Sequence, residues 1–184
     1  MEKNCTDYDS GVKLGTVEGK IHSIVATLQT QNEDGVTSPH YIYCNWSQAN
    51  VALDKVEVPS IIYVLPPSGK LDFSWNRVKD APNAQIAFVV PTDFDFDSED
   101  NEDLIEQMKR LCIKFVLAVN ESGMFELIEG DLPYRVLYDH LNQNVTGIVI
   151  EPQLKETDGI WICADPEIRQ KFVKLEDLED SDNG

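Results

Sequence analysis

Residues 93–156 read DFDFDSEDNEDLIEQMKRLCIKFVLAVNESGMFELIEGDLPYRVLYDHLNQNVTGIVIEPQLKE and decide the fold. Apolar residues recur there at spacings of three and four, which predicts an amphipathic helix over residues 98–120. Asp97 or Ser98 is the expected N-cap, acidic residues fill the first turn, where the helix dipole favours them, and Gly123 is the expected left-handed stop. The apolar face of this helix comprises Leu104, Met108, Leu111, Phe115 and Val119.

Two alternating segments follow the helix. Residues 134–141 and 145–154 each alternate along the chain, and the short polar link 142–144 joins them. This pattern predicts an antiparallel hairpin. We expect the apolar face of the long helix to pack against this hairpin and against residues 85–90, a continuous apolar run typical of a strand buried on both faces.

The first half of the chain adds a second helix and further strands. Spacings of three and four over residues 12–30 predict the helix, although Gly15 and Gly19 each weaken it by roughly 1 kcal/mol against alanine. Pro59 is expected near a strand start or on a sheet edge, because proline cannot donate to a ladder. The remaining assignments are strands at 40–46 and 56–65, a turn at 66–69, a returning strand at 70–75 and a turn at 79–83.

The chain therefore predicts an α+β fold, an antiparallel sheet with two packed helices and a C-terminal extension. Residues 1–11 are polar and form an expected N-terminal arm, residues 12–158 form the domain, and residues 159–184 form an acidic C-terminal extension. The extension has too many apolar residues for a free tail, so we predict that it contacts a neighbouring subunit. The residues expected to make this inter-subunit contact are Trp161, Ile162, Ile168, Phe172, Val173 and Leu175.

Charge and composition exclude several classes of protein. The formal net charge is −18 in 20.8 kDa, which disfavours binding to nucleic acid or to an anionic membrane. The sequence has no apolar run of about 18 residues and no basic, apolar leader, so neither a membrane span nor a signal peptide is expected. Four scattered cysteines without a secretory signal favour reduced thiols over disulfides.

No set of residues predicts catalysis or a metal. Asp93, Asp95 and Asp97 are spaced like the start of a calcium loop, but the sixth and twelfth positions hold Ser98 and Leu104 instead of the required glycine and glutamate. His40 and Cys44 lie four apart in a predicted strand without a second pair of ligands, so we expect a surface histidine and a buried thiol. Cys112 is expected in the core, and no nucleotide-binding glycine motif occurs. We therefore predict no enzyme activity, no cofactor and no metal.

The chain resembles the tail-terminator and head–tail connector proteins of tailed bacteriophages, in particular those of phages of gut Bacteroides-type bacteria and of crass-like phages. The resemblance covers roughly residues 14–156. Its elements are an N-terminal helix, the PSIIYVLPPSG strand and turn, an apolar strand, and TDFDFD leading into EDLIEQMKRLCIKFVLAVNESGMFELI. The hairpin RVLYDHLNQNVTGIVIEPQLKE completes it. The extension beyond Gly159 lies outside the resemblance.

The resemblance implies a tail-terminator-like α+β fold and a virion protein, assembled in the host cytoplasm, that forms a homo-oligomeric ring of six or twelve copies in the phage neck or tail. Such a ring would join the head or portal to the tail, contact neighbouring connector and tail proteins, and let double-stranded DNA pass without specific binding. A long-tail terminator and a ring of a short-tail barrel both remain open. The acidic residues expected to line the lumen or an interface are Asp93, Asp95, Asp97, Glu99 and Asp100.

The competing hypothesis is an acidic DNA mimic or regulatory binding protein. Net charge alone would permit this class. A mimic would spread carboxylates at phosphate-like spacing over one long face, whereas here they cluster before the long helix and at the C-terminal end.

Overall fold

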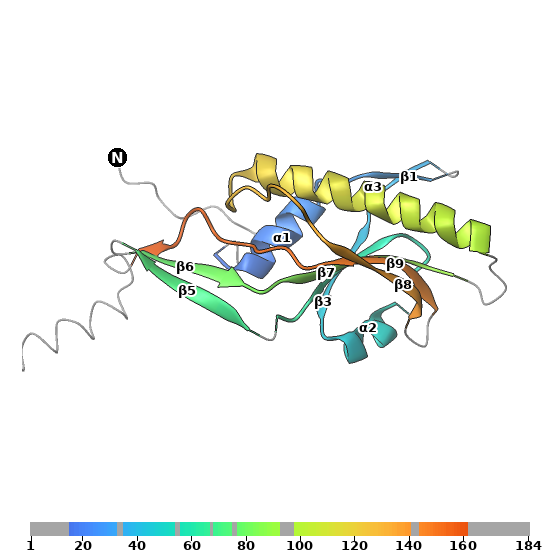
Figure 1. The fold of residues 1–184 in the computed structure, drawn as a ribbon, viewed down its shortest axis with the longest axis horizontal. Coiled ribbons are helices and arrows are strands. Elements are labelled where there is room, and N and C mark those ends of the chain that lie inside the picture. The colour runs from blue at the N-terminus through green and yellow to red at the C-terminus, as the bar shows by residue number, and fades with distance from the viewer. Residues whose placement is uncertain are drawn as a thin grey trace, which may run out of the picture.

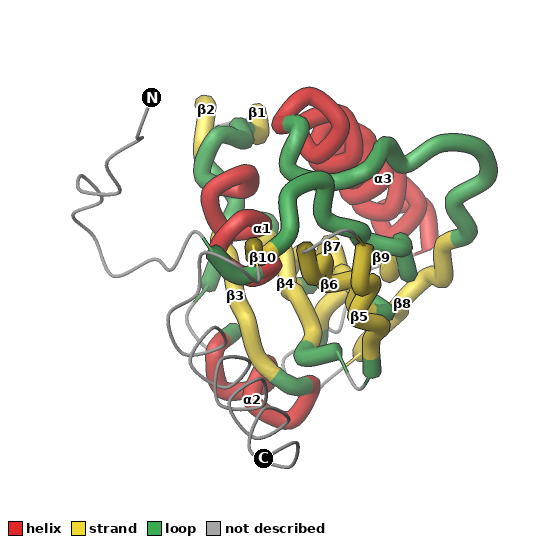
Figure 2. Tube along the Cα trace, turned by 90° about the vertical axis from the view of Figure 1, so that its left-hand side faces the viewer, coloured by secondary structure: helices red, strands yellow, loops and turns green. Residues whose placement is uncertain are grey.

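In the computed structural model, a five-stranded sheet is covered by helices on both faces (Figures 1 and 2). The structure describes residues 15–32, 35–53, 56–66, 68–74, 77–92, 98–140 and 144–161. The strand order of the main sheet is β3-β4-β7-β9-β8. One core lies between the sheet and helices α1 and α3, and a smaller core lies between the opposite face and α2.

The described chain contains three helices and ten strands, from an N-terminal helix to a short final strand. The helices are α1 (Val17–Val25), α2 (Trp46–Ala52) and α3 (Ser98–Ser122). The strands of the main sheet are β3 (His40–Cys44), β4 (Ser60–Val64), β7 (Gln85–Pro91), β8 (Tyr134–His140) and β9 (Val145–Ile150). The other strands are β1 (Thr30–Asn32), β2 (Gly35–Thr37), β5 (Gly69–Ser74), β6 (Arg77–Pro82) and β10 (Ile160–Trp161).

The main sheet is mixed, so the prediction of an antiparallel sheet is wrong in one pairing. The pairs β4–β7, β7–β9 and β9–β8 are antiparallel, but β3 and β4 run parallel. The segment that connects β3 to β4 contains α2, and a parallel pair needs such a crossover because a tight turn cannot return the chain to the same end. The predicted α+β class holds, with this mixed sheet in place of the antiparallel one.

The predicted packing of the long helix is confirmed for four of its five face residues; Leu104 is only half-buried and lies outside the core. Met108, Leu111 and Phe115 are buried between α3 and the sheet, and the ring of Phe115 meets that of Phe88 edge-on with centroids 5.6 Å apart. Gly123 has a φ of 65° just after the helix, a conformation that glycine adopts without the steric cost of a side chain. The helix begins and ends within two residues of its predicted bounds.

The N-terminal helix is shorter than predicted. It begins at Val17 because Thr16 caps it, accepting a hydrogen bond from the backbone N–H of Gly19 at 3.1 Å, and it ends at Val25. Gly15 therefore precedes the helix. Residues 12–14 lie outside the described part of the chain.

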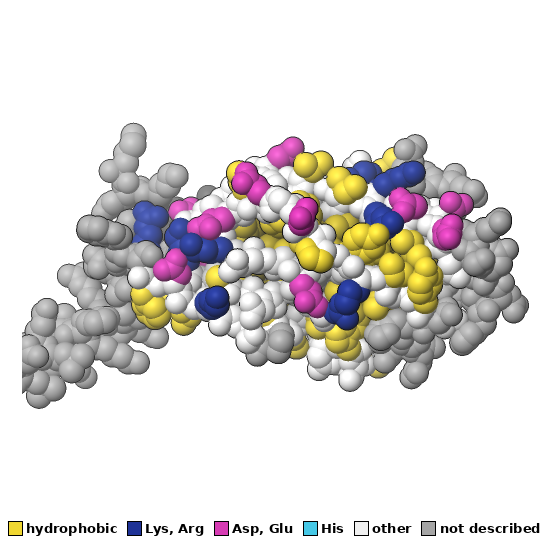
Figure 3. Space-filling view, viewed as in Figure 1, with side chains coloured by type: hydrophobic (Ala, Val, Ile, Leu, Met, Phe, Trp, Pro, Cys, Tyr) yellow, Lys and Arg dark blue, Asp and Glu magenta, His cyan; other side chains and the backbone are white. Residues whose placement is uncertain are grey.

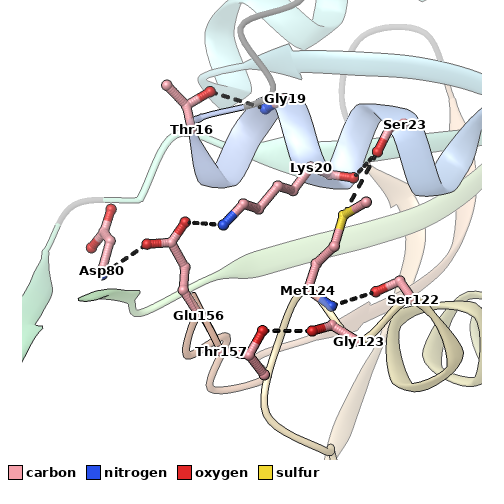
Figure 4. Close-up of polar contacts among 10 residues, drawn as sticks. All are labelled: Thr16, Gly19, Lys20, Ser23, Asp80, Ser122, Gly123, Met124, Glu156 and Thr157. Atoms are coloured by element: carbon pink, nitrogen blue, oxygen red, sulfur yellow. Dashed lines mark hydrogen bonds and ion pairs between the residues drawn. The ribbon is translucent and has the colours of Figure 1, made fainter. Parts of the chain in front are cut away.

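A buried ion pair fastens this helix to the end of the domain (Figure 4). Lys20 Nζ donates to Glu156 Oε1 at 2.6 Å, and the second carboxylate oxygen accepts the backbone N–H of Asp80 at 3.0 Å. Both side chains of the pair are largely buried, 13% exposed for lysine and 7% for glutamate. The carboxylate thus joins α1, β6 and the segment after β9.

Two further elements differ from the sequence predictions. Residues 79–82 belong to strand β6 and do not form the predicted turn; β6 pairs antiparallel with β5. The predicted strand 40–46 ends at Cys44, where Asn45 begins α2 by exchanging backbone and side-chain hydrogen bonds with Gln48. The N-terminal arm, residues 1–11, and residues 162–184 of the extension lie outside the described residues.

Candidate assembly surface

An apolar groove of ≈ 330 Å³ lies between α3 and the strands β8 and β9. Apolar side chains dominate its lining. The lining residues are Lys109, Cys112, Ile113, Val116, Leu117, Leu132, Tyr134, Ile148 and Ile150. Figure 3 shows hydrophobic side chains gathered along this boundary between the long helix and the sheet.

The helical wall of the groove arises because the apolar residues of α3 extend beyond its contact with the sheet. Met108 and Phe115 point into the core, while Ile113 and Leu117, four residues apart, lie on the outer side. These two side chains are 58% and 54% exposed. Residues four apart lie on the same face of a helix, so they form one continuous apolar wall.

The opposite side of the groove is formed by Leu132, by Tyr134 of β8 and by Ile148 and Ile150 of β9, and strand β8 continues beyond the groove. Its alternation places Tyr134, Val136 and Tyr138 on one face, and these side chains are 49%, 37% and 57% exposed. Together with the helical wall, this makes five large apolar side chains along one surface. Large exposed apolar patches often mark surfaces that bind a partner.

β8 is also an edge strand. Within the described residues it pairs only with β9, and its pairing is irregular between Leu137 and His140. An open edge presents backbone N–H and C=O groups to another chain. The groove and the open edge therefore form one continuous surface suited to covering by protein.

The chemistry of the groove is that of binding. Lys109 donates to Glu106 at 2.6 Å and lies 5.1 Å from the centre of the Tyr134 ring, and both partners raise the pKa of the lysine. Burial raises the pKa of the Cys112 thiol to about 11, so the sulfur stays protonated near neutral pH and is a poor nucleophile. The residues that line the groove can hold an apolar segment, and the one cation among them, Lys109, is already paired with Glu106.

A second hollow, of ≈ 440 Å³, lies at the start of β7 and the end of β9. Its floor includes Gln85 and Glu151, whose side chains are 3.0 Å apart in a hydrogen bond, and Arg135 donates to the same carboxylate at 2.8 Å. These donors lower the pKa of Glu151. The glutamate thus stays ionised and already has two partners, so this hollow is the weaker candidate for a binding site.

The structure describes only some of the residues that were considered as metal ligands. His40 is exposed and Cys44 is buried on β3, as predicted for a surface histidine and a buried thiol. Across the ranges that the structure describes, no group of three or more His, Cys, Asp or Glu residues could hold a metal ion. Asp93, Asp95 and Asp97 lie outside these ranges, and the backbone of Glu99 and Asp100 forms the first turn of α3.

Nearly all of the residues predicted to make the inter-subunit contact lie outside the part of the chain that the structure describes. The backbone of Trp161 pairs with Arg77 of β6 as part of β10. Ile162, Ile168, Phe172, Val173 and Leu175 are beyond the described residues. The groove itself was not predicted, although Ile113 and Leu117 gave a signal: they are apolar and lie off the expected core face.

Comparison with known proteins found no matching family model, no curated protein and no solved structure. Among the described helices, none combines the length and apolarity that a membrane crossing requires.

Proposed function

We propose that this chain is a structural virion protein that forms a homo-oligomeric ring in the neck or tail of a tailed phage. The ring joins the head or portal to the tail, and DNA passes through its lumen. The observation that carries the proposal is the apolar groove beside the open edge of β8. The sequence resemblance to tail-terminator and connector proteins is the reason for proposing that the assembly is a ring.

The groove supports assembly because apolar side chains that stay in contact with water lose the free energy that burial would provide. The groove-lining side chains Ile113 and Leu117 each leave more than half of their surface in water, and covering apolar surface gains roughly 25 cal/mol per Å². Interface cores are enriched in aromatic residues and depleted of charge. This surface has that composition, in a chain with charged residues at 26% of its positions.

The net charge of −18 suits a subunit that surrounds DNA without binding it. Like charges repel within about one Debye length, roughly 8 to 10 Å at physiological salt. A contact between two different surfaces of the same chain, repeated around an axis, closes a ring. Acidic monomers also repel one another in solution, so association is expected to strengthen as salt rises.

The proposal is tested by the size of the purified full-length chain as salt and protein concentration rise. We expect sedimentation velocity to show a shift from monomers to one closed species, and electron micrographs to show rings with six-fold or twelve-fold symmetry. A chelator should leave the rings intact, because assembly is proposed to need no calcium. Monomers at every salt and protein concentration would refute the proposal, and tight binding of such monomers to a nucleic-acid enzyme would favour the DNA-mimic class.

A further inference from the structure

We propose that the main sheet continues from one copy of the chain to the next, with the β8 edge of one copy paired antiparallel with the β3 edge of its neighbour. The inference rests on the proposed function, because it takes the neighbour to be the next subunit of the ring. It names the two surfaces of the chain that meet in that ring.

The main sheet has an open edge at each end. Within the described residues, β3 pairs only with β4 and β8 only with β9, and the two strands lie at opposite margins of the sheet (Figure 2). Proteins usually protect an open edge with charged residues or proline. Neither β3 nor Tyr134–Leu137, the regular part of β8, contains proline, aspartate or glutamate, and Arg135 already pairs with Glu151 at 2.8 Å. Two copies of this acidic chain can therefore join these edges without placing carboxylates of the two strands opposite one another.

The outward-facing backbone groups of β3 follow from its hydrogen bonds. In a strand, the N–H and C=O of one residue point to the same side, and alternate residues point to opposite sides. The N–H of His40 and the carbonyl of Cys44 both bond to residues that flank β4, at 2.9 and 3.0 Å. Tyr41 and Tyr43 therefore present their N–H and C=O groups to the open edge.

The same alternation identifies the outward-facing groups of β8. The N–H of Thr92 donates to the carbonyl of Asn144 at 2.7 Å, so the even-numbered residues of β9 face β7 and the odd-numbered residues face β8. Pro91 agrees with this, because it lies opposite an odd-numbered residue and has no N–H to donate. Odd-numbered residues of β9 lie opposite odd-numbered residues in the regular part of β8. Tyr134 and Val136 therefore present their N–H and C=O groups outward.

The outward-facing residues of both edges carry exposed side chains on the same face of the sheet. Tyr43 is 42% exposed and stacks on Tyr63, which belongs to the core beneath α1 and α3. Tyr134 and Val136 lie opposite β9 residues of that same core and are 49% and 37% exposed. In any antiparallel ladder, outward-facing residues of one strand bond to outward-facing residues of the other. The pairing therefore places these side chains directly across from one another, as stabilising cross-strand pairs.

The strand directions make this junction antiparallel. β3 and β4 run parallel, and the pairs β4–β7, β7–β9 and β9–β8 are antiparallel, so β8 runs opposite to β3. A rotation about an axis along the strands preserves both strand direction and the face that points away from the axis. A contact between two different edges can thus repeat around that axis and close a ring, whereas β8 paired with β8 stops at a dimer.

Proline variants of the full-length chain test each edge separately. A proline at an outward-facing position removes the donor that a neighbour needs and leaves the ladder within the chain intact. Val136→Pro blocks the β8 edge, and Tyr43→Pro blocks the β3 edge. Leu71→Pro is the matched control on strand β5, where the hydrogen bond from Asn83 to Ser68 shows that Leu71 faces outward. Leu71 is 61% exposed.

We expect Val136→Pro and Tyr43→Pro each to weaken self-association by about 30-fold or more, because a carbonyl of the neighbouring strand is buried without its donor. Leu71→Pro should associate like the wild type. A mixture of the two edge variants should form heterodimers, seen by sedimentation of a labelled Val136→Pro copy, because its intact β3 can pair with the intact β8 of the other variant.

Amide hydrogen exchange of the wild type gives a second measurement that needs no variant. Assembly should slow exchange at the amides of Tyr43 and Val136 by roughly tenfold or more, because each becomes hydrogen-bonded between copies. Exchange at the amide of Leu71 should not change. If a proline variant fails to fold, this measurement decides alone, and unchanged exchange at Tyr43 and Val136 on assembly overturns the inference.

The outcomes separate this inference from the proposed function. Rings that persist in both edge variants would overturn the inference and leave the ring proposal standing. Open chains in the wild type that both variants abolish, with heterodimers on mixing, would support the edge pairing and refute the ring. Loss of association in only one of the two variants would mean that one edge pairs with itself, and loss in both folded variants without heterodimers would equally overturn the pairing of β8 with β3. A wild type that stays monomeric throughout would overturn both proposals.

Discussion

Truncation of Phe115 is the sharpest test of how the long helix packs. Phe115 is fully buried, at 0% exposure, and its ring meets Phe88 edge-on at 5.6 Å. Removing a buried phenylalanine to alanine costs roughly 3 to 5 kcal/mol, and the aromatic contact adds about 0.5 to 1.5 kcal/mol beyond the area term. We therefore expect Phe115→Ala to lower the free energy of unfolding by about 3.5 to 6.5 kcal/mol.

The assay is urea unfolding followed by circular dichroism, at a protein concentration low enough that association does not stabilise the fold. With a denaturant slope near 2 kcal/mol/M for a small domain, the midpoint should fall by roughly 2 to 3 M. Leu127→Ala is the control: its side chain is 61% exposed, and its cost should stay within about 0.5 kcal/mol. A loss below about 1 kcal/mol for Phe115→Ala would show that the contact between α3 and the sheet is misplaced.

Three further predictions concern other parts of the fold. Glu156→Ala leaves Lys20 without its buried partner and should cost roughly 3 to 5 kcal/mol in urea unfolding. The control Glu151→Ala breaks the exposed pair with Arg135 and should cost at most about 1 kcal/mol. Equal losses in the two variants would contradict the burial of the Lys20–Glu156 pair. Gly147→Ala places a Cβ against the carbonyl oxygen of Phe88 and should cost at least about 3 kcal/mol by overpacking, while a neutral effect would mean that β7 and β9 lie further apart. The pKa of Cys112 is about 11 when folded and about 8.5 when unfolded, so between these values the unfolded state loses its proton first and stability falls as pH rises. Cys112→Ala should reduce that fall by roughly 2 to 3 kcal/mol, judged as the difference from wild type because the tyrosines also titrate there, and identical pH profiles would refute it.

The elements that the sequence predicts well are those whose own residues settle their structure. Helix α3 has a long apolar periodicity, an acidic first turn and a glycine stop, so its bounds follow within two residues. Strand β7 is a continuous apolar run, and burial on both faces follows from that. The hairpin of β8 and β9 is local, since its two strands follow one another along the chain.

The elements that the sequence misses depend on distant partners or on short signals. The parallel pairing of β3 with β4 cannot be read from alternation, because parallel and antiparallel strands alternate alike. The start of α2 had a signal, since Asn45 and Gln48 form a capping box, but the β-forming residues before it extended the strand prediction through Trp46. Lys79–Pro82 has the composition of a turn, yet its pairing with β5 makes it a strand.

The candidate site was harder to predict than the fold. Its walls come from a helix and from a strand that follows it by more than ten residues, and only the packed structure shows which apolar side chains remain uncovered. Ile113 lies off the expected core face of the helix and Tyr134 lies in a predicted strand of the core sheet, and both are about half exposed or more. The excess of apolar residues beyond what one core can cover is the signal that could have indicated a binding surface.

The ion pair between Lys20 and Glu156 affects the order in which the chain can mature during synthesis. Its two residues are 136 positions apart, so helix α1 leaves the ribosome long before its partner carboxylate exists. The apolar side of α1, with Ile21 and Ile24, also waits for α3 before it is covered. At about 5 to 20 residues per second, this interval lasts from several to tens of seconds. The nascent chain therefore presents the apolar side of this segment to chaperones or to other nascent copies until α3 (Ser98–Ser122) has been made, and Lys20 stays without its partner until translation has passed residue 156.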